Sequence, residues 1–238
     1  MYLTTKNSVR EALNSGLTIN KLIVMIGNKD YEIEKLLKLA REKKIKIDYL
    51  AKNILDKKYG KNQGIVAESV DYKYAQVSDI LNKAQGEDAF ILILDGISDP
   101  HNFGAIIRSA ECAGVHGIII PKDRAVAVND TVIKTSTGAV SNMLIARVTN
   151  INNEIEKLKK QGIWVWCAEA GGKDIYSTDL TGPVALVIGS EGFGVSKLTK
   201  EKCDGIISMP MLGKVNSLNA SVATGIVLFE TVRQKRSK

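Results

Sequence analysis

Three short polar side chains at the start of a predicted helix are the most chemically suggestive feature of this sequence. Ser217, Asn219 and Ser221 lie in the segment 208–223, SMPMLGKVNSLNASVA, with only small residues on the helix face behind them. Their hydroxyl and amide groups lie beside backbone N–H groups that a helix start leaves unpaired, which suits an electron-rich ligand or a reacting oxygen. A plain cap on a buried helix would use the same residue types, so this segment alone leaves both interpretations open.

An asparagine, a glycine and an arginine form a second polar group in the segment 99–114, DPHNFGAIIRSAECAG. Asn102 stands where an apolar strand turns into a helix, and Gly104 removes side-chain bulk there. Arg108 follows Gly104 by four positions, so both lie on one helix face. The guanidinium offers a rigid fork of donors to a phosphate or a developing oxyanion. The spacing is weakly specific by itself, because an arginine on a helix is usually only solvated.

A glycine-rich turn follows another apolar strand in the segment 184–196, VALVIGSEGFGVS. Gly189, Gly192 and Gly194 allow a close backbone approach or a positive φ, and Glu191 adds one carboxylate. The dinucleotide-binding pattern G-x-G-x-x-G is absent. A structural turn remains the alternative for this segment taken alone.

All three segments stand at the C-terminal ends of predicted strands, which is where open α/β sheets bind ligands. From Ala89 onward strands alternate with helices, and near-continuous apolar strands indicate a parallel sheet covered on both faces. The predicted strands are 89–96, 117–121, 144–148, 163–169, 184–190 and 205–210. The later predicted helices are 129–138, 151–161 and a final helix that ends near 234.

The first 70 residues alternate helices and strands on a smaller scale. Helices are expected at 6–15, 31–44 and 51–57, and strands at 21–27, 44–50 and 63–69. This pattern indicates a compact α/β/α sandwich.

The net charge of +7 is concentrated in the first part of the chain. Residues 1–84 carry a net charge of +6, and residues 85–238 carry +1. Such an excess suits a surface that follows nucleic-acid phosphates, although a Lys-rich helix such as 35–46 is as often a solvated face. No apolar run approaches the ~18 residues that span a bilayer, and the polar N-terminus lacks a signal-peptide pattern. A cytoplasmic protein without a membrane partner is expected.

The cysteines and histidines form no recognisable metal site. Cys112, Cys167 and Cys203 are far apart, odd in number and without a C-x-x-C pair. His101 and His116 have neither triad nor zinc-ligand spacing. The sequence therefore predicts neither a disulfide framework nor a bound metal.

Together the three polar segments resemble the three motifs of the SpoU branch of the SPOUT methyltransferase superfamily. The matching residues are Asn102, Gly104, Arg108, Gly189, Glu191, Gly192, Pro210, Gly213, Ser217, Leu218, Asn219 and Ser221. The resemblance covers residues 88–234 and departs at Ser190, where the family most often has Asn. It implies an α/β fold with a SPOUT-type parallel-sheet domain and a C-terminal trefoil knot. Periodicity alone indicates an ordinary doubly wound sheet, because threaded chains are rare.

The N-terminal part carries a looser resemblance. The segment 62–69, NQGIVAES, is similar to the HQGIVA-type strand of bacterial 23S rRNA (guanosine-2′-O)-methyltransferases, with Asn62 in place of the usual His. This implies a small L30e-like α/β/α domain. The expected organisation is an RNA substrate-binding domain at 1–72, a linker at 73–87 and a knotted S-adenosylmethionine-dependent methyltransferase domain at 88–238.

The resemblance also implies a cofactor and residue roles. S-adenosylmethionine would be held by the knotted loops at Thr137, Gly138, Gly189, Glu191, Gly192, Met209 and Leu218. The implied catalytic residues are Arg108, Asn102, Glu191, Ser217 and Asn219. The implied reaction is methyl transfer to a ribose 2′-hydroxyl. We expect Arg108 to stabilise the developing alkoxide rather than to take its proton, because a guanidinium stays protonated in proteins.

The resemblance further implies a homodimer that uses the final helix, where Val222, Ile226 and Phe229 form an apolar stripe; a monomer that buries this stripe is the alternative. The favoured substrate is a guanosine in 23S rRNA. Methylation of a tRNA guanosine, or of an rRNA adenosine as in resistance enzymes, is the alternative within the same chemistry. An inert RNA-binding or ribosome assembly factor is the alternative from another class, and it has no use for all five catalytic-type residues.

Overall fold

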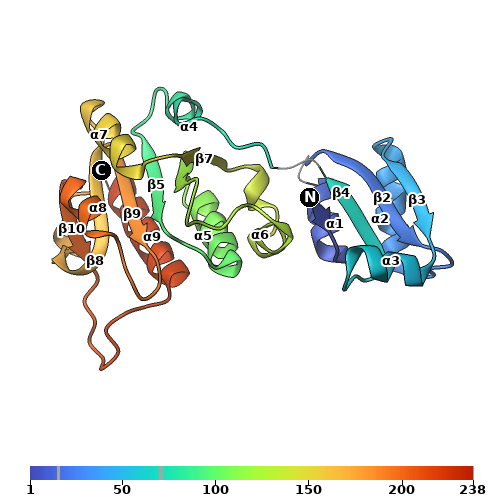
Figure 1. The fold of residues 1–238 in the computed structure, drawn as a ribbon. Helices are drawn as coiled ribbons and strands as arrows, with labels where there is room; N and C mark the ends of the chain where they lie inside the picture. Colours follow the sequence, from blue (N-terminus) through green and yellow to red (C-terminus); the bar gives the residue numbers. More distant parts are fainter. Residues whose placement is uncertain (15–16, 70–71, 238) are drawn as a thin grey trace. The chain divides into compact units, whose positions relative to one another are not determined.

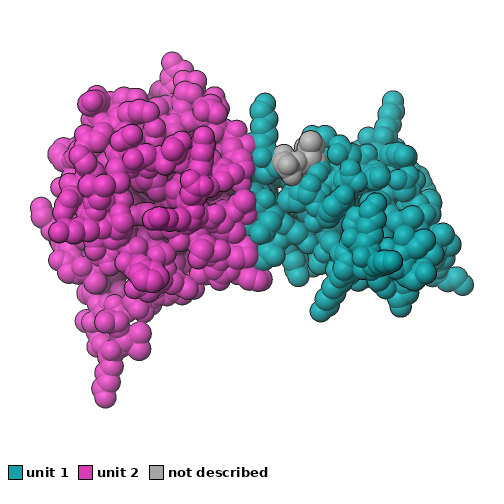
Figure 2. Space-filling model, viewed as in Figure 1, with its two compact units in different colours: residues 1–73, 128–142 teal, residues 74–127, 143–238 magenta. Residues whose placement is uncertain are grey.

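The chain folds into two compact units, and each is described by itself. The computed structural model describes residues 1–14, 17–69 and 72–237. One unit comprises residues 1–73 and 128–142, and the other comprises residues 74–127 and 143–238 (Figure 2). Residues 15–16, 70–71 and 238, which fall within the predicted first helix and the two predicted domains, lie outside the described residues.

The first unit is built on a mixed four-stranded sheet. Its strands follow the order β1 (Tyr2–Leu3), β4 (Ile65–Ser69), β2 (Ile19–Met25) and β3 (Lys46–Leu50). β2 pairs in parallel with β3, and β4 runs antiparallel to both β1 and β2. The helices of this part are α1 (Lys6–Asn14), α2 (Tyr31–Glu42) and α3 (Lys52–Tyr59). The predicted helices and strands are therefore confirmed, with ends that move by at most two residues.

A distant segment of the sequence also belongs to the first unit. It holds α6 (Asp130–Ser136) and the short 3-10 helix η1 (Ala139–Ser141). Asp130, the first residue of α6, accepts hydrogen bonds at its Oδ2 from the backbone N and the Oγ1 of Thr4, at 3.3 and 3.2 Å. The boundaries drawn from the sequence, 1–72, 73–87 and 88–238, stay a prediction about domains and differ from the compact units at this segment.

The second unit is a six-stranded sheet in which every strand pair is parallel (Figure 1). Its strands follow the order β10 (Gly205–Ser208), β8 (Trp164–Asp174), β9 (Val184–Gly189), β5 (Phe90–Asp95), β6 (Gly117–Pro121) and β7 (Leu144–Val148). Its helices are α4 (Val77–Lys83), α5 (Pro100–Cys112), α7 (Ile151–Lys160), α8 (Lys197–Lys202) and α9 (Ala220–Arg236), with the 3-10 helix η2 (Ile175–Ser177). The predicted parallel α/β sheet is confirmed, and the trefoil knot stays a prediction. Among the described residues, no helix is long and apolar enough to cross a membrane.

The sheet core consists of the near-continuous apolar strands that the sequence contains. Ile91 and Ile93 of β5 pack with Ile155 of α7 in one buried cluster. Leu92 and Leu94, which alternate with them, are also buried. Because successive side chains of a strand point to opposite faces, both faces of β5 are covered.

Helix α4 lies inside the segment predicted as a linker. Ile80 of α4 is fully buried and packs so closely on Gly117 that a side chain at Gly117 would overlap it. The Asp79 carboxylate closes the start of the helix by accepting a hydrogen bond from the backbone N of Gln76 at 2.8 Å. Val77 and Leu81 pack against the same core cluster, but the polar residues around them led to the prediction of a linker.

The centre of the second sheet is the point where the strand order reverses. β5 leads through α5 to β6 on one side, and β9 leads through α8 to β10 on the other side. β5 and β9 are hydrogen-bonded neighbours, and Asp95 at the end of β5 is in register with Gly189 at the end of β9. Open α/β sheets form ligand sites outside the carboxyl ends of strands at such a point. The loops that follow β5 and β9 are thus placed side by side there.

Candidate active site

A ring of three polar side chains joins the three motifs of the sequence. The Glu191 Oε1 atom accepts hydrogen bonds from Asn102 Nδ2 at 3.0 Å and from Asn219 Nδ2 at 2.5 Å. Asn219 Nδ2 also donates to Asn102 Oδ1 at 3.0 Å, which closes the ring. The backbone N of Ala220 donates to the same Glu191 oxygen at 3.2 Å. Residues separated by about 90 to 120 positions therefore meet at one point, as the predicted convergence of the motifs requires.

Two helix starts hold the asparagines of this ring. Asp99 caps α5, because its Oδ1 accepts from the backbone N of His101 at 2.8 Å, and Asn102 is buried in the first turn that follows. Asn219 caps α9, because its Oδ1 accepts from the backbone N of Ser221 at 2.9 Å. Asn219 thus uses its oxygen for the helix and its nitrogen for the ring. The plain cap and the polar site, which the sequence left as alternatives, are both present in this residue.

A tight turn holds the carboxylate of the ring. Ser190 and Gly194 exchange backbone hydrogen bonds at 3.2 and 2.9 Å, so Glu191, Gly192 and Phe193 form the tip of the turn. A side chain at Gly189 would overlap the backbone of Gly194, which explains the glycine.

Two carboxylates fix the far end of this turn. Glu169 Oε2 accepts from the backbone N of Val195 at 2.9 Å, and Asp95 Oδ2 accepts from the backbone N of Ser196 at 3.1 Å. Asp95 is the last residue of β5, and Glu169 belongs to β8. The turn after β9 is therefore tied to both neighbouring strands.

A cavity of about 570 Å³, here called the α9 cavity, lies on one side of the ring. Its walls are β8, the turn 189–194, the segment between β10 and α9, and the start of α9. The apolar lining includes Ile188, Met209, Leu218 and Val227. The volume and the mixture of apolar side chains with a few polar groups are typical of a small-molecule site.

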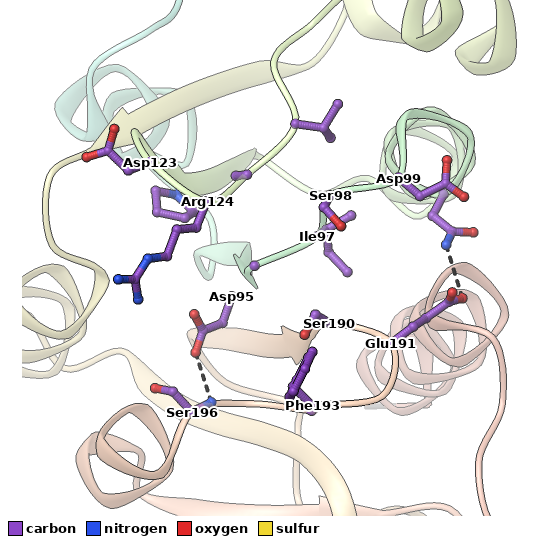
Figure 3. A pocket seen from close by; sticks show the side chains of 16 residues that line it. Asp95, Ile97, Ser98, Asp99, Asp123, Arg124, Ser190, Glu191, Phe193 and Ser196 are labelled. Atoms are coloured by element: carbon purple, nitrogen blue, oxygen red, sulfur yellow. Dashed lines mark hydrogen bonds between the residues drawn. The ribbon is translucent and has the colours of Figure 1, made fainter.

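A second cavity of about 840 Å³, here called the β5 cavity, lies on the other side (Figure 3). Three segments line it: the end of β5 with the start of α5, the segment 121–126 after β6, and the turn after β9. Ser190, Glu191 and Gly194 line both cavities. The ring therefore stands at the boundary between two spaces that can each hold a ligand.

Most of the predicted site residues gather at this boundary. The α9 cavity is lined by Gly189, Glu191, Gly192, Met209, Ser217, Leu218 and Asn219. Asn102 lines the β5 cavity and completes the ring.

The structure leaves three predicted residues outside both cavity linings. Arg108 is exposed on α5, and its guanidinium makes no hydrogen bond or ion pair with another described residue. Thr137 and Gly138 follow α6 in the other compact unit, with φ angles of 48° and 89°. The predicted roles of these three residues stay predictions.

Residues that are specific to the β5 cavity were not predicted from the sequence. Asp95, Arg124 and Phe193 line it. A strand-ending Asp and an aromatic residue between two glycines are visible in the sequence, but Arg124 comes from the loop after β6 and carries no local signal.

Comparisons with known proteins give the context for this geometry. The family model of the SpoU rRNA methylases matches residues 89–229. A second family model, described as RNA 2′-O ribose methyltransferase substrate binding, matches residues 6–75. YacO of Bacillus subtilis (strain 168), which is named as a TrmH family tRNA/rRNA methyltransferase, is 43% identical over 98% of this chain and 96% of its own length. A protein of Staphylococcus saprophyticus with the same family name is 44% identical over 99% of this chain and 96% of its own length.

Solved structures share the fold over the whole chain. The SpoU methyltransferase AviRb of Streptomyces viridochromogenes, in complex with the cofactor AdoMet, has a TM-score of 0.82 and 24% identity over 100% of this chain and 91% of its own. An rRNA methyltransferase of Sinorhizobium meliloti has a TM-score of 0.77 and 25% identity, with coverages of 98% and 86%. The likeness includes both the small N-terminal part and the parallel sheet that carries the ring.

Proposed function

Because the chain belongs to the SpoU rRNA methylase family of RNA 2′-O-ribose methyltransferases, we propose that it transfers a methyl group from S-adenosylmethionine to a guanosine in 23S rRNA. The acceptor is the ribose 2′-hydroxyl. The observation that carries the proposal is the ring of Asn102, Glu191 and Asn219, which borders both cavities. A transferase of this kind needs a donor site and an acceptor site that share one wall, so that the reacting atoms meet.

The α9 cavity fits S-adenosylmethionine. Its apolar residues, Ile188, Met209 and Leu218, suit a flat neutral adenine, and the glycine turn gives backbone groups close access to a ligand. We assign Gly189, Glu191, Gly192, Met209 and Leu218 to the donor. The resemblance to the family adds Thr137 and Gly138 as further donor-binding residues. When bound, S-adenosylmethionine supplies a methyl group activated by the positive charge on its sulfur.

The ring residues act as positioning groups in this proposal. Asn102 and Asn219 hold the Glu191 carboxylate at the boundary between the cavities, where one oxygen already accepts three hydrogen bonds. The Ser217 hydroxyl lines the same wall and offers a donor or an acceptor. A fixed set of polar groups lowers the reorganisation that the reaction requires.

Arg108 is assigned to the developing alkoxide and an adjacent phosphate. A guanidinium carries a positive charge and offers only donors, so the assigned role is to stabilise negative charge and not to serve as a base. Its exposure and its lack of a partner among the described residues leave it available to RNA. A water molecule or a nucleotide phosphate then takes the hydroxyl proton.

The N-terminal domain is assigned to RNA recognition. Residues 6–75 match the substrate-binding family, and residues 1–84 carry a net charge of +6. Positive charge of this size favours the phosphate backbone without regard to sequence. A homodimer that packs through the exposed Val222, Ile226 and Phe229 of α9 is part of the proposal. A tRNA guanosine is the second candidate substrate, because both relatives described above carry tRNA/rRNA in their names.

The proposal is tested by mapping ribose methylation in rRNA and tRNA from cells with and without the gene. The expected result is the loss of a single 2′-O-methylguanosine in 23S rRNA, which the purified enzyme restores with S-adenosylmethionine. Loss of a tRNA modification alone would support the second candidate. An unchanged methylation pattern, together with no heat of binding for S-adenosylmethionine in calorimetry, would support an inert assembly factor.

A further inference from the structure

The proposed function places the donor in the α9 cavity and assigns no ligand to the β5 cavity, although the two cavities share Ser190, Glu191 and Gly194. A group bound there lies against the ring at which the methyl transfer is proposed. Resting on that proposed function, we propose that the β5 cavity receives the base of the target nucleotide. Phe193 stacks on the base, while Arg124 and Asp95 read its edge and select guanine.

Phe193 has the properties of a stacking platform. Its side chain is 94% exposed, which is unusual for a large apolar group, and it lines the β5 cavity. Gly192 and Gly194 flank it with φ angles of 84° and 65°, and the backbone hydrogen bonds between Ser190 and Gly194 hold the turn. Proteins that recognise single-stranded RNA stack unpaired bases on exposed aromatic side chains.

The charge of the β5 cavity favours a base over a phosphate. Carboxylates outnumber the single guanidinium in its lining, which contains Asp95, Asp99, Asp123, Glu191 and Arg124. A phosphate would be repelled by this excess of negative charge, whereas the N–H groups of a base can donate to carboxylate oxygens. The RNA backbone is therefore expected to stay outside, and the base to enter.

Arg124 and Asp95 lie in one cavity lining without pairing with each other. Arg124 makes no ion pair or hydrogen bond with any described residue. Its backbone φ of 59° lies in the left-handed region, which residues other than glycine rarely adopt. Asp95 Oδ2 is occupied by the backbone N of Ser196, while Asp95 Oδ1 accepts no hydrogen bond from a described residue. Figure 3 places both side chains on the same side of the cavity, across from Glu191. A donor fork and an acceptor are thus available to one ligand.

Guanine matches this pair of groups. Its O6 and N7 atoms accept from a guanidinium, and its N1–H and exocyclic amino group donate to a carboxylate. Adenine presents an amino donor beside N7 and an acceptor at N1, so it meets both groups with at least one mismatch. The geometry therefore favours a guanosine over the adenosine that the sequence analysis left open.

The test uses transcribed 23S rRNA fragments that carry either guanosine or adenosine at the mapped target. Phe193→Ala should raise the KM for RNA by about 5- to 100-fold, and Phe193→Trp should restore it. Arg124→Ala should reduce the preference for guanosine over adenosine by about 5- to 100-fold. Lys160→Ala, which removes an exposed positive charge on α7 outside both cavities, is the control and should leave the preference unchanged.

The affinity for S-adenosylmethionine, measured by calorimetry, should be the same in all four variants. Wild-type KM and base preference in both Phe193→Ala and Arg124→Ala would overturn the inference. An equal loss on both templates in Arg124→Ala, with a weaker dependence on salt, would mean a phosphate contact and would also overturn it. Failure of the wild-type enzyme to methylate any RNA would instead reject the proposed function itself.

Discussion

Asn219 serves the α9 helix and the polar ring with different atoms, so two substitutions can separate these roles. Asn219→Ala removes both the cap and the ring donor. Asn219→Asp keeps an oxygen for the backbone N of Ser221, and Asp caps helices about as well as Asn. The same change replaces the donor that lies 2.5 Å from Glu191 Oε1 with a second carboxylate oxygen.

The two variants should therefore be impaired for different reasons: Asn219→Ala by loss of the helix cap and of the ring donor, and Asn219→Asp by repulsion between two carboxylates. Loss of the cap in Asn219→Ala costs about 1 kcal/mol of stability, which lowers the Tm of a protein of this size by about 2–4 °C at every pH. Asn219→Asp keeps the cap, so a fall in its Tm comes from carboxylate repulsion and should be smaller at pH 6 than at pH 8. Two carboxylates about 4 Å apart repel by about 1 kcal/mol in water and about 4 kcal/mol near a protein surface. Asn219→Asp should therefore lose about 5- to 1000-fold in kcat/KM at pH 8, because each 1.36 kcal/mol is a factor of ten.

The defect of Asn219→Asp should also depend on pH. Neighbouring carboxylates raise the pKa of the pair, so one proton is taken up as the pH falls, and a shared proton restores a hydrogen bond in the ring. The assay measures methyl transfer and S-adenosylmethionine affinity at pH 6 and pH 8, with thermal unfolding alongside. Asn216→Asp is the control, because it adds the same charge to the wall of the α9 cavity without touching the ring. Wild-type activity of Asn219→Asp at pH 8, or a loss that is equal at both pH values, would refute the reasoning.

Gly189, Arg108 and Glu230 each allow a further test of the structure. Gly189→Ala should weaken S-adenosylmethionine binding by about 5- to 150-fold or more, because the new methyl group overlaps the backbone of the turn at a cost of about 1–3 kcal/mol or more. A methyl group added at Gly213 meets no atom within 4 Å, so Gly213→Ala should stay within about 0.5 kcal/mol of wild type in thermal unfolding. Equal effects of the two substitutions would contradict this. Arg108→Lys should lower kcat strongly at every pH, since Lys lacks the guanidinium fork; nearly full turnover with a shifted pH optimum would show that residue 108 acts as a base. Hydrogen bonds from Arg233 lower the pKa of the buried Glu230 carboxyl below its ordinary 4.5. The stabilisation by this carboxylate is therefore complete above pH 4.5 and is lost as the pH falls through the lowered pKa. Glu230→Gln should lower the Tm at pH 7, and the difference in Tm from wild type should shrink near pH 3; a difference that does not depend on pH would be inconsistent with this.

The parallel sheet and the meeting of the three motifs at the carboxyl ends of its strands were predicted from the sequence. Asn102, Glu191 and Asn219 each follow an apolar strand, and neighbouring parallel strands bring their carboxyl ends together. The apolar runs also predicted the parallel sheet, because strands buried on both faces need no polar alternation. The meeting of the three motifs therefore follows from strand order and sheet geometry, whereas the hydrogen bonds that join Asn102, Glu191 and Asn219 were not predicted.

The remaining features depend on loop geometry and on single packing contacts. Arg124 lines the β5 cavity from the loop after β6, where its own backbone φ is 59°. The residue types of this loop do not predict that conformation. Ile80 of helix α4 packs against Gly117 of β6. Hydrophobic periodicity indicates which residues of a segment are buried, but not which distant segment they contact. The exposure of Phe193 follows from the hydrogen-bonded turn between Ser190 and Gly194, and an apolar residue between glycines could equally have been buried.

A crystal structure of the full chain with S-adenosylmethionine tests the central claim most directly. The account predicts that the ligand fills the α9 cavity, with its adenine against Ile188 and Leu218 and its methyl group facing Glu191. A ligand bound elsewhere in an active enzyme, without contact to the ring of Asn102, Glu191 and Asn219, would contradict it.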